Sequence, residues 1–311
     1  MTVLLKEKPL GFASRLVNGI LAIKPLANFA KTRARKMMID RAEVLGVPWR
    51  KNFEELSKRN WNSEWDAVAN KQIQYPDYYV NSFHAYAEGN LSWQAAWEVE
   101  SAAYAVHAKI WPEAGAKGDA KLRQSYHQIL QEQLITSPKN IVDLGCGVGM
   151  STLALQDIYP QAQITGVDLS PYFLAVASYR ASKGQNEINW LNVAAENTGL
   201  PDNSCDLVSA CLMFHELPAI ASQKIISEAQ RILRPGGHLA IMDMNPRSQT
   251  FAKMPPYILT LLKSTEPYLD QYFDLDFEKT LIESGFVKPT ITISSPRHRT
   301  IVAELASSTK S

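Results

Sequence analysis

The stretch of sequence that decides the fold is NIVDLGCGVGMS, residues 140–151. A short apolar run ends in an acid, three alternating glycines follow, and helix-forming residues come next. This order predicts a buried strand, a tight turn and a helix N-terminus, which together are typical of a nucleotide-type ligand site. The spacing is Gly-x-Gly-x-Gly, with Asp143 two residues before the first glycine. Dinucleotide-binding turns have the spacing Gly-x-Gly-x-x-Gly instead.

Strands and helices alternate along the chain on both sides of this turn. We expect strands at 140–144, 163–168, 188–193, 205–212, 237–243, 289–295 and 300–305, and helices at 149–158, 171–183, 219–233 and 275–285. Such alternation predicts an α/β fold with a mostly parallel sheet and helices on both faces. The last two strands are separated by a short turn that suits a hairpin, so one strand should run antiparallel at the sheet edge.

An acid follows the second predicted strand, about twenty residues after the glycine turn. This acid is Asp168, in the sequence GVDLS, residues 166–170. In a parallel sheet its carboxylate would lie beside the turn and accept hydrogen bonds from both hydroxyls of a ribose. The turn and Asp168 together therefore predict a nucleoside-containing ligand.

These residues resemble the class I S-adenosylmethionine-dependent methyltransferases. The stretch VDLGCGVG, residues 142–149, is similar to the glycine-rich signature of that family, and GVDLS to its ribose-binding strand. Similar too are PDNSCDLV, residues 201–208, and ILRPGG, residues 232–237. The resemblance covers about residues 120–305 and points to the branch that contains ubiquinone and menaquinone C-methyltransferases. It implies a Rossmann-like sheet of seven strands, six parallel and one antiparallel edge strand, with a helical N-terminal extension.

The resemblance also implies a set of contacts to the cofactor, S-adenosylmethionine. Asp143 would lie near the methionine amino group, and the turn residues Gly145, Cys146 and Gly147 under the methionine and ribose. Asp168 would bind the ribose diol.

The adenine side of the implied site departs from the family pattern. Leu169 would pack on the adenine ring. The family usually has an acid followed by a small residue after the third strand, but the acid position is Ala194 in this chain. Ala195 would then offer only its backbone, and Glu196 is the expected substitute acid.

Candidate catalytic residues follow the fourth and fifth predicted strands, at the carboxyl edge where ligands bind in such sheets. A histidine ordinarily titrates near neutrality, so His215 would accept a proton from a phenol or an activated carbon. Glu216 and Asp243 are further candidates of the same kind, with Asp243 also expected to face the substrate. The alternative is that His215 only shapes the pocket.

The first third of the chain is predicted to be a helical extension and substrate lid, residues 1–118, in front of a methyltransferase domain, residues 119–311. Six of the seven tryptophans lie between residues 49 and 111. We expect loop residues of this region to contact the substrate, namely Tyr78, Tyr79, His84 and Tyr86. A purely structural placement of these side chains is the alternative.

The N-terminal 41 residues are basic, with nine lysines and arginines against two acids. A helix is predicted over 12–45, with Pro25 dividing it. It would either lie on anionic lipid or dock on the domain with a solvated charged face. The chain lacks an apolar run of spanning length, so we expect a cytoplasmic protein, with peripheral membrane contact left open.

The expected reaction is methyl transfer to a small apolar or aromatic acceptor, quinone-like or lipid-like, with no nucleic-acid partner and no metal. The three cysteines show neither disulfide nor metal spacing. Two other functions stay open: a non-catalytic binding protein of the same fold, and a nicotinamide-dependent oxidoreductase. The glycine spacing argues against the second. The sequence does not indicate the accepting atom or the oligomeric state.

Overall fold

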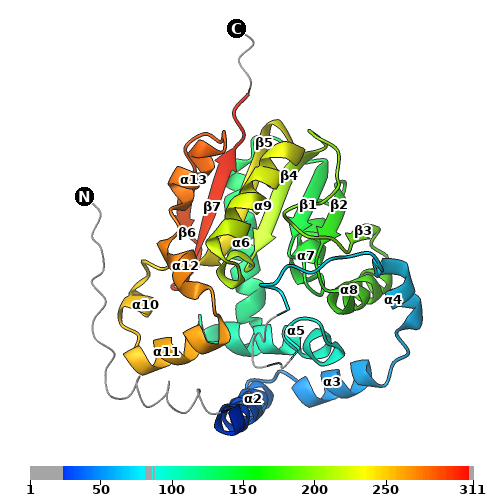
Figure 1. Cartoon of the computed structure of the whole chain (residues 1–311), viewed down its shortest axis with the longest axis vertical. Coiled ribbons are helices and arrows are strands. Elements are labelled where there is room, and N and C mark those ends of the chain that lie inside the picture. Colours follow the sequence, from blue (N-terminus) through cyan, green and yellow to red (C-terminus); the bar gives the residue numbers. More distant parts are fainter. Residues whose placement is uncertain (1–23, 81–85, 87, 308–311) are drawn as a thin grey trace.

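A seven-stranded sheet forms the centre of the molecule (Figure 1). The structure, a computed structural model, describes residues 24–80, 86 and 88–307. The strand order is β3-β2-β1-β4-β5-β7-β6. The strands are β1 (Asn140–Leu144), β2 (Gln163–Val167), β3 (Ile188–Leu191), β4 (Cys205–Cys211), β5 (Leu233–Met244), β6 (Thr290–Ile293) and β7 (His298–Glu304).

The sheet has six parallel strands and one antiparallel strand, as the sequence predicts. β1 pairs in parallel with β2 and β4, β2 with β3, and β4 with β5. β7 pairs antiparallel with both β5 and β6. The short turn between β6 and β7 makes them a hairpin, in which β7 lies against β5 and β6 lies outermost.

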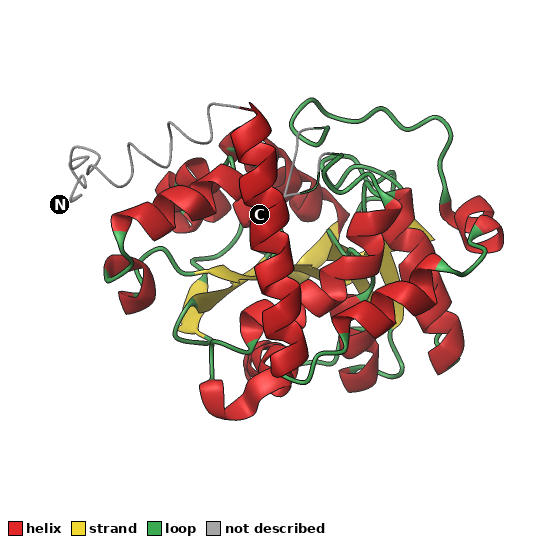
Figure 2. Cartoon of the chain, turned by 90° about the horizontal axis from the view of Figure 1, so that it is seen from below, coloured by secondary structure: helices red, strands yellow, loops and turns green. Residues whose placement is uncertain are grey.

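Helices cover both faces of the sheet (Figure 2). On one face the apolar core includes side chains of α9 and α13, and on the other it includes side chains of α6 and α7. The four helices predicted after the glycine turn all form, with ends shifted by a residue or two. They are α7 (Met150–Ile158), α8 (Pro171–Gly184), α9 (Ala219–Ile232) and α13 (Phe277–Glu283).

The helices before the sheet lie beyond the carboxyl ends of the parallel strands (Figure 1). They are α2 (Lys24–Val44), α3 (Trp49–Ser57), α4 (Asn62–Val68), α5 (Trp93–His107) and the 3-10 helix η1 (Pro112–Lys117), whereas α6 (Gly118–Gln133) packs on a face of the sheet. Trp93 stacks on Trp61 and on Trp97, and its ring also contacts Tyr172 of α8. The aromatic-rich stretch therefore forms a core of its own that joins α4 and α5 to α8.

The predicted basic helix is described only in part, because residues 12–23 lie outside the described ranges. The described part of this helix is α2, which spans Lys24–Val44 and contains Pro25. None of the helices in the described ranges is long and apolar enough to cross a membrane.

Three short helices between β5 and α13 were not predicted from the sequence. They are α10 (Gln249–Ala252), α11 (Pro256–Thr265) and α12 (Leu269–Asp274). Ser248 caps α10 by accepting a hydrogen bond from the N–H of Phe251, and Pro256 is in the first turn of α11. These helices continue the layer of α2 and α5 beyond the sheet edge (Figure 1).

Candidate active site

A cavity of about 620 Å³ lies at the carboxyl edge of the sheet. Its floor is formed by the residues that follow β1, β2, β4 and β5, and its walls come from α2, α5, α10 and α11. Cavities of this size are typical of small-molecule sites. The cavity brings together residues from both ends of the chain.

The glycine turn forms one wall of the cavity. Because Leu144 pairs with Val167, the turns after β1 and β2 lie side by side. Gly145 and Gly147 both have positive φ, 64° and 55°. A Cβ at Gly145 would lie 2.5 Å from Sδ of Met213, whereas a Cβ at Gly147 would meet no atom closer than 4.0 Å. Gly147 therefore leaves free space where the backbone lines the cavity.

Asp168 lies beside this turn, as the sequence predicts. One carboxylate oxygen accepts a hydrogen bond from the N–H of Gly147 at 2.8 Å, and the other accepts one from the N–H of Ser170 at 2.7 Å. Burial raises the pKa of Asp168 to about 6, although these two N–H groups favour the ionised form. The carboxylate retains lone pairs for a ligand, since each oxygen can accept more than one hydrogen bond.

Asp143 is held away from the cavity surface. One oxygen accepts hydrogen bonds at 2.7 Å from Ser151 and from Thr152, at the start of α7. Its other oxygen is buried and has no hydrogen-bond partner among the described atoms. Among the described residues, Asp143 does not belong to the cavity lining. In this structure its contacts fix the turn to α7.

The residues predicted for the adenine side line the cavity together. Leu169 and Ala195 are both lining residues, and so is Glu196. The hydroxyl of Tyr78 donates a hydrogen bond of 2.6 Å to Glu196. The substitute acid is therefore held in place by a side chain of the N-terminal region.

The predicted substrate residues fall into two groups. Tyr79 lines the cavity, and its hydroxyl lies 3.4 Å from the carboxylate of Asp168, so it faces the cofactor side of the cavity. Tyr86 also lines the cavity, and its hydroxyl donates to Glu98 of α5 at 2.9 Å. His84 lies outside the described residues.

His215 lines the cavity and forms a buried pair with Asp243, which is not itself among the described lining residues. Nδ1 of His215 lies 2.7 Å from Oδ1 of Asp243, and the backbone N–H of His215 donates to Oδ2 at 3.2 Å. Burial lowers the pKa of His215, but the charge and hydrogen bond of Asp243 outweigh this effect and raise it to about 9. His215 in turn holds the pKa of Asp243 below its usual value, against the opposing effect of burial.

Comparisons with known proteins identify the family. The family described as Methyltransferase domain matches residues 142–241. An uncharacterized methyltransferase of Synechocystis is 30% identical over 164 residues, which cover 52% of this chain and 74% of that protein. The chain belongs to the class I S-adenosylmethionine-dependent methyltransferases.

Two further comparisons are more limited. A demethylmenaquinone methyltransferase of Thermus thermophilus is 32% identical over 110 residues, which cover 35% of this chain and only 49% of that protein. The solved structure of a candidate O-methyltransferase from Nostoc punctiforme has a TM-score of 0.53 at 18% identity, covering 72% of this chain and 65% of that one. This second likeness shows the shared fold alone.

The cavity of this methyltransferase fits S-adenosylmethionine, the cofactor of the family. The space left at Gly147 and the ionisable carboxylate of Asp168 suit a ribose packed against backbone. Acidic side chains near them suit a cofactor that carries a positive sulfonium. The acids in the lining are Asp168, Glu196, Glu216 and Glu266.

Several residues of the site were not predicted from the sequence. Asn192 donates to the carbonyls of Asp168 and Leu169 at 3.1 and 2.8 Å, and its own oxygen accepts from the N–H of Asn70 at 3.1 Å. Leu212, after β4, has a φ of 58°, which is strained for a branched residue and is often found at functional sites. The position of Asn192 near the end of the predicted strand 188–193 is the sequence signal that could have pointed to it.

Proposed function

We propose that this methyltransferase methylates a hydroxyl or an acidic carbon of a small apolar or aromatic acceptor, with His215 as the base. The observation that carries the proposal is the His215–Asp243 pair, because His215 lines the same cavity as the glycine turn and Asp168 and is held there by Asp243. A base oriented by a carboxylate beside a cofactor site is suited to removing the proton of such a nucleophile.

The chain's own residues would divide the work between binding and proton transfer. When bound, S-adenosylmethionine supplies a methyl group on an already activated sulfonium, so the protein mainly has to position the acceptor and exclude water. Gly147 and Asp168 would hold the ribose, and Leu169 and Ala195 the adenine. Arg123 of α6 is a buried cation of the lining and would hold the methionine carboxylate.

The His215 imidazole has to be neutral to accept a proton. In the free protein its raised pKa means that it is mostly protonated at neutral pH. A cationic ligand beside it would disfavour that second positive charge and lower the pKa. Asp243 keeps Nδ1 occupied, so that Nε2 is the nitrogen left to accept the proton of the acceptor.

The remaining walls of the cavity support an apolar acceptor. Apolar side chains come from α5 on one side and from α10, α11 and the segment between them on the other. They include Val99, Ala102, Val106, Phe251, Met254 and Ile258. The similarity to demethylmenaquinone methyltransferases also favours a quinol-like ring, and the helical region before residue 119 would act as the lid over it.

The proposal is tested by methyl transfer from radiolabelled S-adenosylmethionine to a naphthoquinol with a short isoprenoid tail, to simple phenols and to fatty acids. We expect label in an organic extract with the wild-type protein and a loss of about 10²–10⁴-fold in His215→Gln. His238→Gln, in the middle of β5 and outside the described cavity lining, is the matched control and should keep full activity. If no acceptor class is labelled while the protein binds S-adenosylmethionine, the chain is a binding protein and the proposal is wrong.

A further inference from the structure

Three arginines line the cavity, and they differ in their partners. Arg35 donates to the buried carboxylate of Glu98 at 3.0 Å through Nε. Arg123 donates to the buried carboxylate of Asp119 at 2.9 Å. Arg297 is half-buried, and no carboxylate in the described part of the chain forms an ion pair with it. It is therefore a cation of the cavity wall whose charge the surrounding protein leaves uncompensated.

The turn between β6 and β7 fixes the backbone of Arg297. Its N–H donates to Oγ of Ser295 at 3.0 Å, and its carbonyl accepts from the N–H of Asn245 at 2.7 Å. Oγ of Ser295 also contacts Nδ1 of His298 at 2.8 Å. Ser295 and His298 are both buried. The guanidinium thus starts from a rigid turn, not from a mobile loop.

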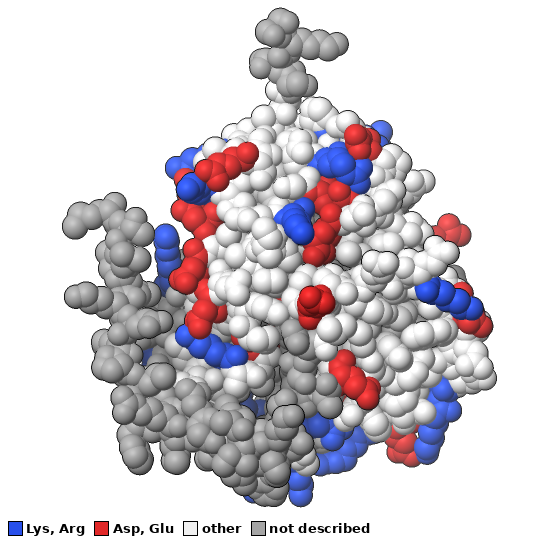
Figure 3. Space-filling view, viewed as in Figure 1, with Lys and Arg blue, Asp and Glu red and all other residues white. Residues whose placement is uncertain are grey.

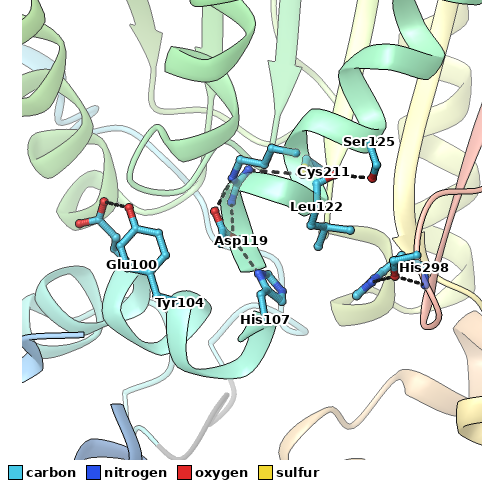
Figure 4. A network of polar contacts seen from close by, with 10 residues as sticks. Glu100, Tyr104, His107, Asp119, Leu122, Ser125, Cys211 and His298 are labelled. Atoms are coloured by element: carbon cyan, nitrogen blue, oxygen red, sulfur yellow. Dashed lines mark hydrogen bonds and ion pairs between the residues drawn. The ribbon is translucent and has the colours of Figure 1, made fainter. Parts of the chain in front are cut away.

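The neighbours of Arg297 do not supply a negative charge. The ring of His298 lies perpendicular to that of His107, at 5.9 Å between centroids, and Asp119 lies between His107 and Arg123 (Figure 4). Burial, followed by the charge of His107, lowers the pKa of His298 to about 3, so its ring is neutral near pH 7. The carboxylate of Asp119 is already shared by two partners, His107 and Arg123.

Lys109, outside the described cavity lining, lies near both Arg297 and a further cation, Arg41. Burial lowers the pKa of Lys109, and the nearby charges of Arg41 and Arg297 lower it further. No ion pair compensates Lys109 or Arg41 within the described ranges. The cavity therefore has an acidic side, which suits the cofactor, and a basic side at Arg297.

A half-buried guanidinium without a counter-ion has lost part of its hydration and gains no ion pair in return. Its planar guanidinium group matches the geometry of a carboxylate or a phosphate, and binding such an anion would compensate for the lost hydration. Met244 pairs with His298 and Asp243 with Arg299, so the turn that carries Arg297 lies next to the catalytic pair. An anion bound there would be close to the reacting atoms.

We propose that Arg297 binds an anionic group, a carboxylate or a phosphate, on the methyl acceptor itself. This inference rests on the proposed function and narrows its substrate class to a compact aromatic or apolar molecule with one acidic substituent. Lys109 and Arg41 add a positive field at the rim and steer such a molecule to the cavity.

The test uses two fluorescent probes that differ in one anionic group. These are 8-anilinonaphthalene-1-sulfonate and its neutral analogue N-phenyl-1-naphthylamine. In Arg297→Gln we expect the anionic probe to bind about tenfold more weakly and the neutral probe to bind within twofold of wild type. Arg297→Lys should lie between the two, and Arg247→Gln, an exposed arginine after β5, is the matched control. An unchanged affinity for the anionic probe, or an equal loss for both probes, would overturn the proposal.

Two further measurements distinguish an acceptor site at Arg297 from a cofactor site and from a lipid site. Calorimetry with S-adenosylmethionine should give the same affinity in Arg297→Gln as in wild type; a tenfold loss would assign Arg297 to the cofactor carboxylate and overturn the proposal. Binding to phosphatidylglycerol vesicles should also be unchanged, and a loss there without a loss of probe binding would assign the cation to lipid headgroups. If methyl transfer fails for every acceptor, the proposed function is wrong, but the probe result still decides the anion site.

Discussion

At the scale of single residues, the site combines a negatively charged group, the carboxylate of Asp168, with a group that holds a proton, the imidazole of His215. Asp168 is ionised above a pKa of about 6 and accepts two backbone hydrogen bonds. His215 holds its proton up to about pH 9 because Asp243 is its close partner. The first group suits the binding of a polar, cationic ligand, and the second suits proton transfer once that ligand is present.

Replacing the Asp168 carboxylate should weaken cofactor binding. In Asp168→Asn we expect a loss on the order of 2–4 kcal/mol, because a charged pair of acceptors for the ribose hydroxyls is removed. Calorimetric titration with S-adenosylmethionine measures this loss. Asp157→Asn, an exposed acid on α7, should bind like wild type. Equal affinities in all three proteins would mean that Asp168 does not hold the ribose.

Removing the Asp243 charge should move the pH dependence of the reaction. The pKa of His215 is raised to about 9 by Asp243, so in wild type kcat/KM should rise with pH up to about that value. In Asp243→Asn the main remaining influence on the pKa of His215 would be burial, which lowers it. The pKa should therefore fall below its ordinary value of about 6.5. The rising limb should therefore shift to lower pH, with a lower plateau because the ring is less well oriented.

The same acceptor should be used for both proteins, so that its own titration affects both profiles equally. A rising limb at the same pH in wild type and in Asp243→Asn would show that His215 is not the base.

The His215–Asp243 pair also contributes to the free energy of unfolding. Because the folded pKa of His215 is raised, that contribution is complete below about pH 6.5 and is lost as the pH rises through about 9.

At the scale of elements, the site depends on how the N-terminal helices are fixed over the sheet edge. Glu98 of α5 is fully buried and connects α2 to the segment before α5, because it accepts from both Arg35 and Tyr86. Ser170 at the start of α8 donates to the carbonyl of Asn90 at 2.7 Å. These contacts hold the helical layer over the sheet edge by buried polar groups as well as by aromatic packing.

Glu98→Gln should destabilise this arrangement. We expect a loss on the order of 3 kcal/mol in the free energy of unfolding, because the buried end of the Arg35 pair loses its charge. The Arg35 side chain is 34% exposed, which keeps the loss at the lower end of the range for buried pairs. Denaturant titration measures it. Glu113→Gln, which breaks the exposed pair with Lys121, should leave the free energy of unfolding essentially unchanged. An equal change in the free energy of unfolding for both variants would show that the buried Glu98–Arg35 pair stabilises the protein no more than the exposed pair does.

At the scale of the whole molecule, charge of both signs is interspersed over the face shown in Figure 3. The basic residues of α2 are a separate feature, with Arg33 and Lys36 exposed on the same helix as Arg35. Deleting the first 41 residues would remove Arg35 as well and leave Glu98 buried without its partner. Substitutions on the exposed side of α2 are therefore the cleaner test of membrane contact.

We expect the double substitution Arg33→Gln with Lys36→Gln to reduce binding to phosphatidylglycerol vesicles. Each basic residue near an anionic surface contributes about 1 kcal/mol, so the loss should be about 30-fold and should shrink as salt is added. Cosedimentation measures it. Lys51→Gln with Lys58→Gln on α3 is the matched control, since both lysines already pair with glutamates. An equal effect of both double substitutions would leave α2 as a packing element only.

The sequence by itself determined the sheet and the position of Asp168 beside the glycine turn. The glycine turn, Asp168 and the strand pattern are local signals, because backbone conformation and strand register depend on neighbouring residues. The sequence could not show that Asp143 would bond to Ser151 and Thr152, or that α10 and α11 would line the cavity. Those short helices have too few turns for a clear period.

The tertiary structure alone decided which distant side chains meet. Asp243 became the partner of His215 because β4 and β5 are neighbouring parallel strands, whose carboxyl ends meet at one edge. Arg297 reached the same cavity because the antiparallel strand β7 begins where β5 ends. Pairings between residues far apart in the chain depend on packing and strand order. No local pattern in the sequence encodes that Arg297 has no counter-ion among the described residues.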